Sequence, residues 1–271
     1  MPCIRGVGDY PRILVSEGDT TVAIGNAGFA AIEKESSTTN QLKIFMSRYF
    51  YLCMGLVMTG LVVWGFSHTV SVNLFHANPP RPRLLWIHGA AFSAWMIFFI
   101  LQSCLVRVRK VSVHRTLGWF GAGLATAMVT LGFTIAVVMA RFDGTVLHQP
   151  GVDAFLSVPF CDMIVFAACI ALAILWRTKP DFHRRLIFIA TCELMDAAIG
   201  RFDYWFNHSI FYVGLDFLIV LGMARDWMVE GRVHKVYLYV LPPMIVLQSL
   251  AVYCWRVNPG WWQGITHAIL Q

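Results

Sequence analysis

The sequence predicts an all-α polytopic membrane protein, a bundle of about seven transmembrane helices. The 271 residues are 58% hydrophobic and only 13% charged, far from the averages of soluble proteins. Apolar runs of about 20 residues, the length a helix needs to cross ~30 Å of hydrocarbon, recur along most of the chain. These runs are continuous and do not alternate with polar residues, which excludes barrel strands and favours helices.

Each apolar run is expected to form one transmembrane helix. The predicted spans are residues 49–67, 84–106, 116–140, 152–176, 186–206, 210–224 and 236–255. They form a predicted seven-helix domain over residues 48–258, between a flexible N-terminal tail of residues 1–47 and a short C-terminal tail of residues 259–271. Met46 is a candidate for the true start of the chain.

Basic residues in the short loops predict the orientation, because cytoplasmic loops collect Lys and Arg. Three alternate loops hold most of them: Arg107, Arg109, Lys110, Arg115, Arg177, Lys179, Arg184, Arg185, Arg225, Arg232 and Lys235. We therefore expect a bacterial-type inner (cytoplasmic) membrane protein with its N-terminus inside and its C-terminus outside. Insertion topology and anionic lipid headgroups of the surrounding bilayer account for the net charge of +6, which is no argument for nucleic acid.

Several ionisable residues fall inside predicted spans at a similar depth in the outer leaflet. The segment CELMDAAIGRFDYW, residues 192–205, supplies Glu193, Asp196 and Arg201. Three other spans supply one residue each: His88, Asp162 and Asp216. A charge in hydrocarbon costs at least ~2.5 to 3.5 kcal/mol, so such residues face the bundle interior and find partners. We expect them to line one polar cavity.

The charge balance of this cavity suggests a ligand. Four carboxyl groups face one obligate cation, Arg201, the predicted charge partner of the pocket. Either some carboxyls stay protonated or a cation completes the site, with His88, Asp162, Glu193, Asp196 and Asp216 as candidate ligands of a divalent metal. Mixed His and carboxylate ligands suit zinc, manganese or iron. The alternative is that Arg201 pairs with one Asp and the network only fixes helix packing.

The seven cysteines are scattered along the chain with no CxxC pair, and all but Cys3 lie within predicted spans. We interpret them as small buried apolar residues.

A second set of residues lies at the predicted cytoplasmic face. His114 and Arg115 begin one span, and His183 and Arg185 precede another. Two histidines at matching depth on different helices can ligate a heme iron from both sides, and Gly118 begins a groove of small residues in which a macrocycle could lie flat. These five residues are the candidate heme b site; the alternative is that they serve topology and headgroup contact.

The order of these residues along the chain resembles that of two families of membrane proteins. The succession HGAAFSAWMIFFILQSCLVRVRKVSVHRTLGWFGA, then KPDFHRRL, then Arg201, resembles an uncharacterised family of bacterial multi-pass membrane proteins over residues 84–201. More distantly it is similar to the transmembrane diheme b-type cytochromes of the ascorbate-reducible kind. That resemblance implies His114 with His183 as an inner heme pair and His88 as one outer ligand. The second outer histidine is missing, since the matching span offers Asp162 beside Cys161.

Two classes of function follow. The first is an electron-transfer protein, in which heme b exchanges electrons with a quinone or a redox partner protein. The second is a heme-free protein whose pocket binds a cation, metal or amphiphile, as a transporter, receptor or metal-dependent hydrolase. An accessory subunit of a membrane complex is a third possibility. Whether the protein is an enzyme is left open.

Overall fold

The computed structural model describes residues 26–271, and the chain divides into two units, residues 1–44 and 45–271. Helix α1 (Asn26–Ser67) begins inside the segment predicted to be a flexible tail. Residues 1–25 of that predicted tail lie outside the described residues. All contacts given below lie within the unit of residues 45–271.

Every described element is helical, as the sequence predicts. After α1 come η1 (Ser71–Phe75), α2 (Leu84–Arg107), α3 (Val111–Thr145), α4 (Val152–Phe155), α5 (Ser157–Leu175), α6 (Pro180–Glu193), α7 (Asp196–Ile199), α8 (Asp203–Asn207), α9 (Phe211–Glu230), α10 (Lys235–Val257) and α11 (Gly260–Leu270).

Five segments are long and apolar enough to cross a membrane, which supports a multi-pass membrane protein. They are Asn40–Ser67, Leu84–Arg107, Val111–Thr145, Val152–Leu175 and Lys235–Val257. The two remaining predicted spans correspond to α6–α8 and to α9, where ionisable residues interrupt the apolar sequence. Seven spans and the N-inside orientation therefore stay predictions.

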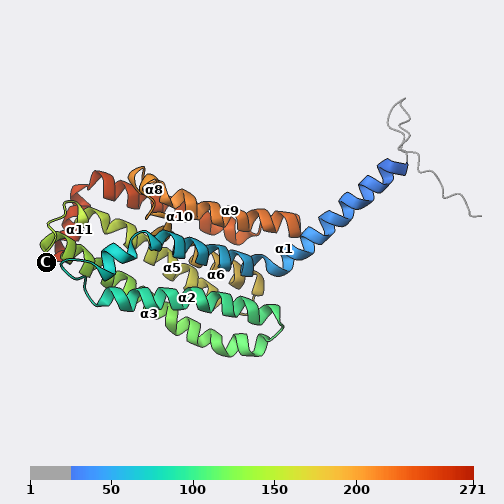
Figure 1. The fold of residues 1–271 in the computed structure, drawn as a ribbon, viewed down its shortest axis with the longest axis horizontal. Coiled ribbons are helices and arrows are strands. Elements are labelled where there is room, and N and C mark those ends of the chain that lie inside the picture. Colours follow the sequence, from blue (N-terminus) through green and yellow to red (C-terminus); the bar gives the residue numbers. More distant parts are fainter. Residues whose placement is uncertain (1–25) are drawn as a thin grey trace, which may run out of the picture. The chain divides into compact units, whose positions relative to one another are not determined.

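Helix α5 forms the centre of the bundle. It packs against α3, α6 and α10, while α2 packs against α3, and α9 packs against α6 and α7. The long helices lie side by side along one common direction (Figure 1). The α5 sequence SVPFCDMIVFAACIALAIL is apolar on all sides, which is the pattern of a helix buried among others. Buried helix α5 therefore places its few polar side chains against neighbouring helices.

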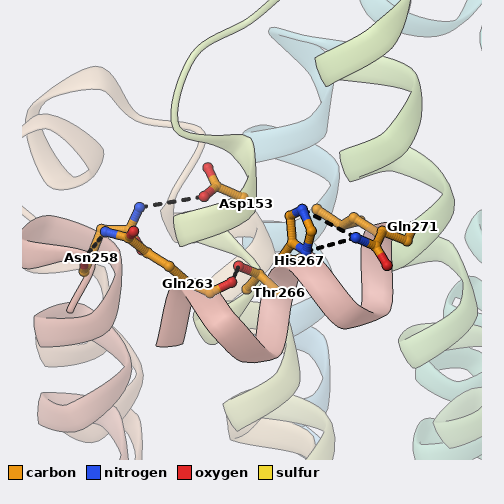
Figure 2. Close-up of a pocket in the computed structure, with 7 residues that line it drawn as sticks. Asp153, Asn258, Gln263, Thr266, His267 and Gln271 are labelled. Atoms are coloured by element: carbon orange, nitrogen blue, oxygen red, sulfur yellow. Dashed lines mark hydrogen bonds between the residues drawn. The ribbon is translucent and has the colours of Figure 1, made fainter. Parts of the chain in front are cut away.

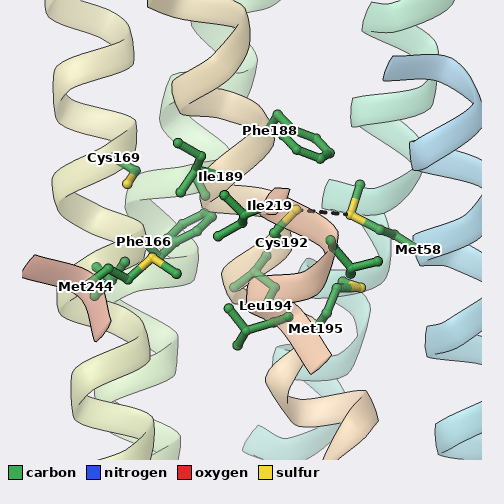
Figure 3. Packing of buried hydrophobic residues seen from close by; sticks show 14 of the residues in the cluster. Met58, Phe166, Cys169, Phe188, Ile189, Cys192, Leu194, Met195, Ile219 and Met244 are labelled. Carbon is green, nitrogen blue, oxygen red and sulfur yellow. Dashed lines mark hydrogen bonds between the residues drawn. The ribbon is translucent and has the colours of Figure 1, made fainter. Parts of the chain in front are cut away.

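The core between these helices is closely packed. Met58 of α1 reaches the middle of the bundle, where its sulfur lies 4.0 Å from the thiol of Cys192 on α6. Figure 3 shows Phe166, Ile219 and Met244 surrounding the same region from α5, α9 and α10. Soft Met and Cys side chains fill the irregular gaps between helices.

The predicted span 186–206 is not one regular helix. Helix α6 ends at Glu193 and α7 begins at Asp196, with a turn between them in which the Met195 N–H donates to the Cys192 carbonyl at 2.9 Å. A second break separates α7 from α8. The first interruption brings two acidic side chains, Glu193 and Asp196, to one place in the bundle.

Residues 259–271, which we predicted as a short tail, are mostly helical. Helix α11 packs on α3 and α4, and the Trp262 indole N–H donates to the Ala154 carbonyl at 3.2 Å. A cavity of about 430 Å³ opens beside α11, and its lining includes Asp153, Asn258 and His267 (Figure 2). Asn258 donates to Asp153 at 3.3 Å, and the His267 ring lies 2.8 Å from the Gln271 amide. This cavity holds none of the predicted site residues.

Candidate functional site: an interior carboxyl cluster

The structure brings the four predicted carboxyl residues to the same part of the bundle from separate helices. Asp162 lies on α5, Glu193 ends α6, Asp196 begins α7 and Asp216 lies on α9. Asp162, Glu193 and Asp196 are buried, Glu193 with 0% exposure, and Asp216 is half-buried. We call these four residues the carboxyl cluster.

Asp162 is the best-connected member of the carboxyl cluster. The Tyr212 hydroxyl of α9 donates to its Oδ1 at 2.8 Å, and the Asp196 carboxyl of α7 lies close enough to interact with it electrostatically. The α5 and α9 helices are thus linked through one aspartate, which also lies near the acidic start of α7.

Glu193, in contrast to Asp162, makes no hydrogen bond through its carboxyl group. Both of its carboxyl oxygens are buried and have no hydrogen-bond partner. The amide of Gln248 on α10 lies near Glu193 and donates to Asp216 at 3.4 Å, which is a weak hydrogen bond by its length. Buried carboxyl oxygens without a hydrogen-bond partner are rare in proteins and lower the stability of the fold. Glu193 is therefore the member of the cluster with unused capacity to bind a ligand.

A cysteine that the sequence analysis treated as apolar belongs to the same site. The Cys161 sulfur and one carboxyl oxygen each from Asp162 and Glu193 all lie within 4.8 Å of one another. All three residues are buried. The available signal was the position of Cys161 directly before Asp162 in a buried helix, but adjacency alone does not show that both side chains face the same neighbour.

A cavity of about 110 Å³ reaches the carboxyl cluster from the end of the bundle that carries α7 and α8. Asp196, Gly200 and Arg201 provide its polar side, and aromatic side chains such as Phe206 and Phe211 provide the apolar side. The volume is enough for water molecules, each of which occupies about 30 Å³ in the liquid. Asp196 therefore lies between this cavity and Asp162.

Arg201 lines the cavity but does not form an ion pair with the cluster. Its Nε donates to the Thr69 hydroxyl at 3.0 Å, its Nη1 donates to the Ala197 carbonyl, and its guanidinium stacks on the Phe66 ring at 3.6 Å from the centroid. Within residues 26–271, no ion pair of 4.0 Å or less reaches any of the four carboxyls. The role of Arg201 as charge partner of the pocket stays a prediction.

His88 does not join the group formed by Cys161, Asp162 and Glu193. Its ring packs on Phe92 with centroids 4.1 Å apart, and its Nδ1 is buried without a partner. Its predicted role as a metal ligand is therefore not supported by proximity.

The second predicted set of residues is partly assembled. The rings of His114 and His183 lie with centroids 6.3 Å apart and planes at 80°. The Nδ1 of His183 lies 2.9 Å from the Ala173 carbonyl, whereas the Nδ1 of His114 has no partner. Beside Gly118, one turn from His114, no atom lies within 4 Å of the position that a Cβ would take.

The arginines predicted beside these histidines differ from each other. Arg115 is exposed. Arg185 is fully buried and directs its guanidinium to Asp226, with Nε to Oδ2 at 2.6 Å and Nη2 to Oδ1 at 2.8 Å, and to Glu230 at 2.6 Å. Arg185 is therefore already occupied by carboxylates and is a poor partner for a heme propionate.

His234, in the loop before α10, borders the same charge network. Burial and the positive charge of Arg185 lower the pKa of His234 below its usual value. Its neutral Nδ1 accepts a hydrogen bond from the Val236 N–H at 3.3 Å and so caps the start of α10. A protonated ring could not accept this bond, so the capping role and the lowered pKa agree.

A scan against protein-family models and searches of curated proteins and of solved structures each found no match to this chain. The functional argument therefore depends on the geometry of the site.

Proposed function

We propose that this integral membrane protein binds a cation inside its helix bundle, at the carboxyl cluster. The observation that carries the proposal is Glu193, whose two carboxyl oxygens are fully buried and unpartnered among three other carboxyl groups. A buried charge of one sign without a partner is strongly unfavourable. A bound cation supplies both the missing charge and the missing partner for Glu193.

The helical arrangement supports this reading. Carboxyl groups inside membrane bundles face the interior and mark ion or proton pathways. The proposed site also has an access path, because Asp196 lines the cavity at the end of the bundle and lies near Asp162. A network that served packing alone would be expected to satisfy its own hydrogen bonds.

Cation-dependent stability tests the proposal. We expect one of Mg²⁺, Ca²⁺, Mn²⁺ or Zn²⁺ to raise the unfolding midpoint of the detergent-solubilised protein. A cation at 100 times its Kd stabilises the folded state by about 2.7 kcal/mol, which corresponds to about 5–10 °C in a chain of this size. Glu193→Gln should abolish the shift.

The matched control is Asp203→Asn, which removes an exposed carboxylate of α8 and should leave the shift unchanged. Absence of any shift in the wild-type protein, or an equal shift in Glu193→Gln, would contradict the proposal.

One observation favours a second candidate function, electron transfer through heme b. The rings of His114 and His183 lie edge to face, and their centroid distance of 6.3 Å accommodates one metal atom between them, given imidazole–metal bonds of about 2 Å each. The Ala173 carbonyl at Nδ1 of His183 is the kind of contact that fixes a ligating imidazole and leaves Nε2 free. The open space beside Gly118 also suits a macrocycle, whereas the occupied Arg185 does not.

In this second candidate, His114 and His183 would hold the heme, which supplies one-electron chemistry toward a quinone or a redox partner protein. Heme-supplemented protein should show a Soret band that shifts reversibly with dithionite. His114→Ala and His183→Ala should each remove the band, and His208→Ala, on an exposed residue, should keep it. A wild-type protein without the band would exclude this function.

A further inference from the structure

We infer that the cation of the carboxyl cluster is a thiophilic divalent metal, of the zinc and cobalt class, held by the Cys161 sulfur together with Asp162 and Glu193. This inference rests on the proposed function, because it names the ligands and the chemical class of the cation for the same site. The ligand atoms of the three residues all lie within 4.8 Å of one another. We call these three residues the thiol–carboxyl site.

The distances fit a metal centre that closes on binding. Metal–sulfur bonds of about 2.3 Å and metal–oxygen bonds of about 2.0–2.2 Å place neighbouring ligands of a tetrahedral site about 3.3–3.8 Å apart. The upper limit of 4.8 Å in the structure exceeds this range by about 1.0–1.5 Å. Glu193 can make the adjustment, because neither of its oxygens is held by a hydrogen bond.

Helices α5 and α6 hold the residues of the thiol–carboxyl site in position. Cys161 and Asp162 are consecutive residues of α5, and Glu193 is the last residue of α6, the helix that packs along α5. Tyr212 holds the Asp162 carboxyl through its 2.8 Å hydrogen bond, as outer residues of metal sites orient the ligands. Asp196 lines the cavity and lies near Asp162, on the side from which an ion would enter.

Charge and ligand type select the metal. A thiolate and two carboxylates carry three negative charges in a buried site, and a dication offsets most of them and keeps a coordinating thiol deprotonated. Thiolate ligands favour zinc and related soft or borderline ions, whereas Mg²⁺ and Ca²⁺ prefer sites made only of oxygen. The presence of Cys161 therefore distinguishes this site from a purely carboxylate site.

Cobalt(II) titration of the full-length protein, purified in detergent under reducing conditions, tests the assignment. A Co²⁺ ion bonded to sulfur gives a sulfur-to-cobalt charge-transfer band in the near ultraviolet. We expect this band in the wild-type protein, its displacement by Zn²⁺ and its loss in Cys161→Ser. Cys169→Ser is the matched control, since Cys169 is also a buried cysteine of α5 but is outside the thiol–carboxyl site; it should retain the band.

A second variant keeps the test decisive if Cys161→Ser does not fold. Tyr212→Phe removes only the hydroxyl that holds Asp162, so the charge-transfer band should remain while cobalt affinity falls about 10- to 100-fold. A band that persists in Cys161→Ser, or unchanged affinity in Tyr212→Phe, would overturn the assignment.

The outcomes separate this inference from the proposed function. Cation binding that depends on Glu193 but gives no sulfur band would leave the carboxyl cluster as a cation site and refute the role of Cys161. Failure of every tested cation, Co²⁺ included, to bind would refute both.

Discussion

Arg185 carries its charge in the interior because carboxylates from a neighbouring helix surround it. The side chain has 0% exposure, as does Asp226, and the two form a pair of parallel hydrogen bonds. Arg225 adds a second cation through its Nη1, 2.8 Å from Asp226 and 2.9 Å from Glu230. Breaking such a buried network leaves an uncompensated charge, so its cost exceeds that of a surface ion pair.

At the residue scale we predict that Asp226→Asn lowers the free energy of unfolding by about 3–5 kcal/mol, because Arg185 loses its principal partner. Asp181→Asn is the control, since Asp181 lies at 2.7 Å from Arg184 but is 63% exposed, and its loss should cost less than about 1 kcal/mol. Denaturant unfolding of both variants in detergent measures the difference. Equal effects would mean that the Asp226 network contributes no more than a surface pair.

The sequence predicted which residues of the site are polar and buried, but not which of them meet. Asp162, Glu193, Asp196 and Asp216 do gather, because each is an isolated acid in an apolar stretch and must face the interior. His88 is not among the three residues whose ligand atoms lie within 4.8 Å of one another, and its role as a metal ligand stays a prediction. Depth along a helix can be computed from residue number, whereas the rotation of one helix against another depends on packing that no single segment encodes.

At the element scale, the contact between α1 and α7 depends on a missing side chain. A Cβ at Gly65 would overlap the backbone carbonyl of Ala198. Small residues let helices in membranes approach closely, and here the approach places α7, with Asp196 at its start, against α1. A backbone carbonyl cannot rotate away as a flexible side chain can.

We therefore predict that Gly65→Ala destabilises the fold by about 1–3 kcal/mol through overpacking. Gly60→Ala on the same helix is the matched control, because no atom lies within 4 Å of the Cβ position there; it should be neutral or stabilising by up to about 1 kcal/mol. Thermal unfolding midpoints of the two variants make the comparison. A tolerated Gly65→Ala would show that α7 can move away from α1 without cost.

The predicted span 186–206 contains helix breaks that its hydrophobicity did not predict. Its hydrophobicity predicted one continuous helix, but α6 stops at Glu193 and α7 and α8 are short. Acidic Asp196 and Asp203 each fall in the first turn of a new helix, a position that suits negative charge. The break after Glu193 therefore decides which way Asp196 and Arg201 face, and the hydrophobicity of the segment does not predict it.

At the scale of the whole molecule, composition and run length were sufficient for the class, because only helices satisfy the backbone of continuous apolar runs in lipid. The all-helical fold and a multi-pass membrane protein follow from the sequence and agree with the structure. The sequence determines the number of spans less well. Helix α9 carries Asp216, Arg225 and Asp226, and whether it can lie in the membrane depends on the tertiary partners of these three residues. Those partners come from other helices, so residue counts cannot supply them.

The buried length of α6 below Glu193 has a consequence for how anything could pass through the molecule. Glu193 lies eight positions after Arg185, about 12 Å along the helix, and Leu186, Phe188 and Ile189 between them have 0% exposure. Moving a bare ion into such an apolar layer costs many kcal/mol. If the carboxyl cluster binds an ion, as we propose, this layer therefore opposes its passage along α6 toward Arg185, and the ion would be released by the cavity through which it entered.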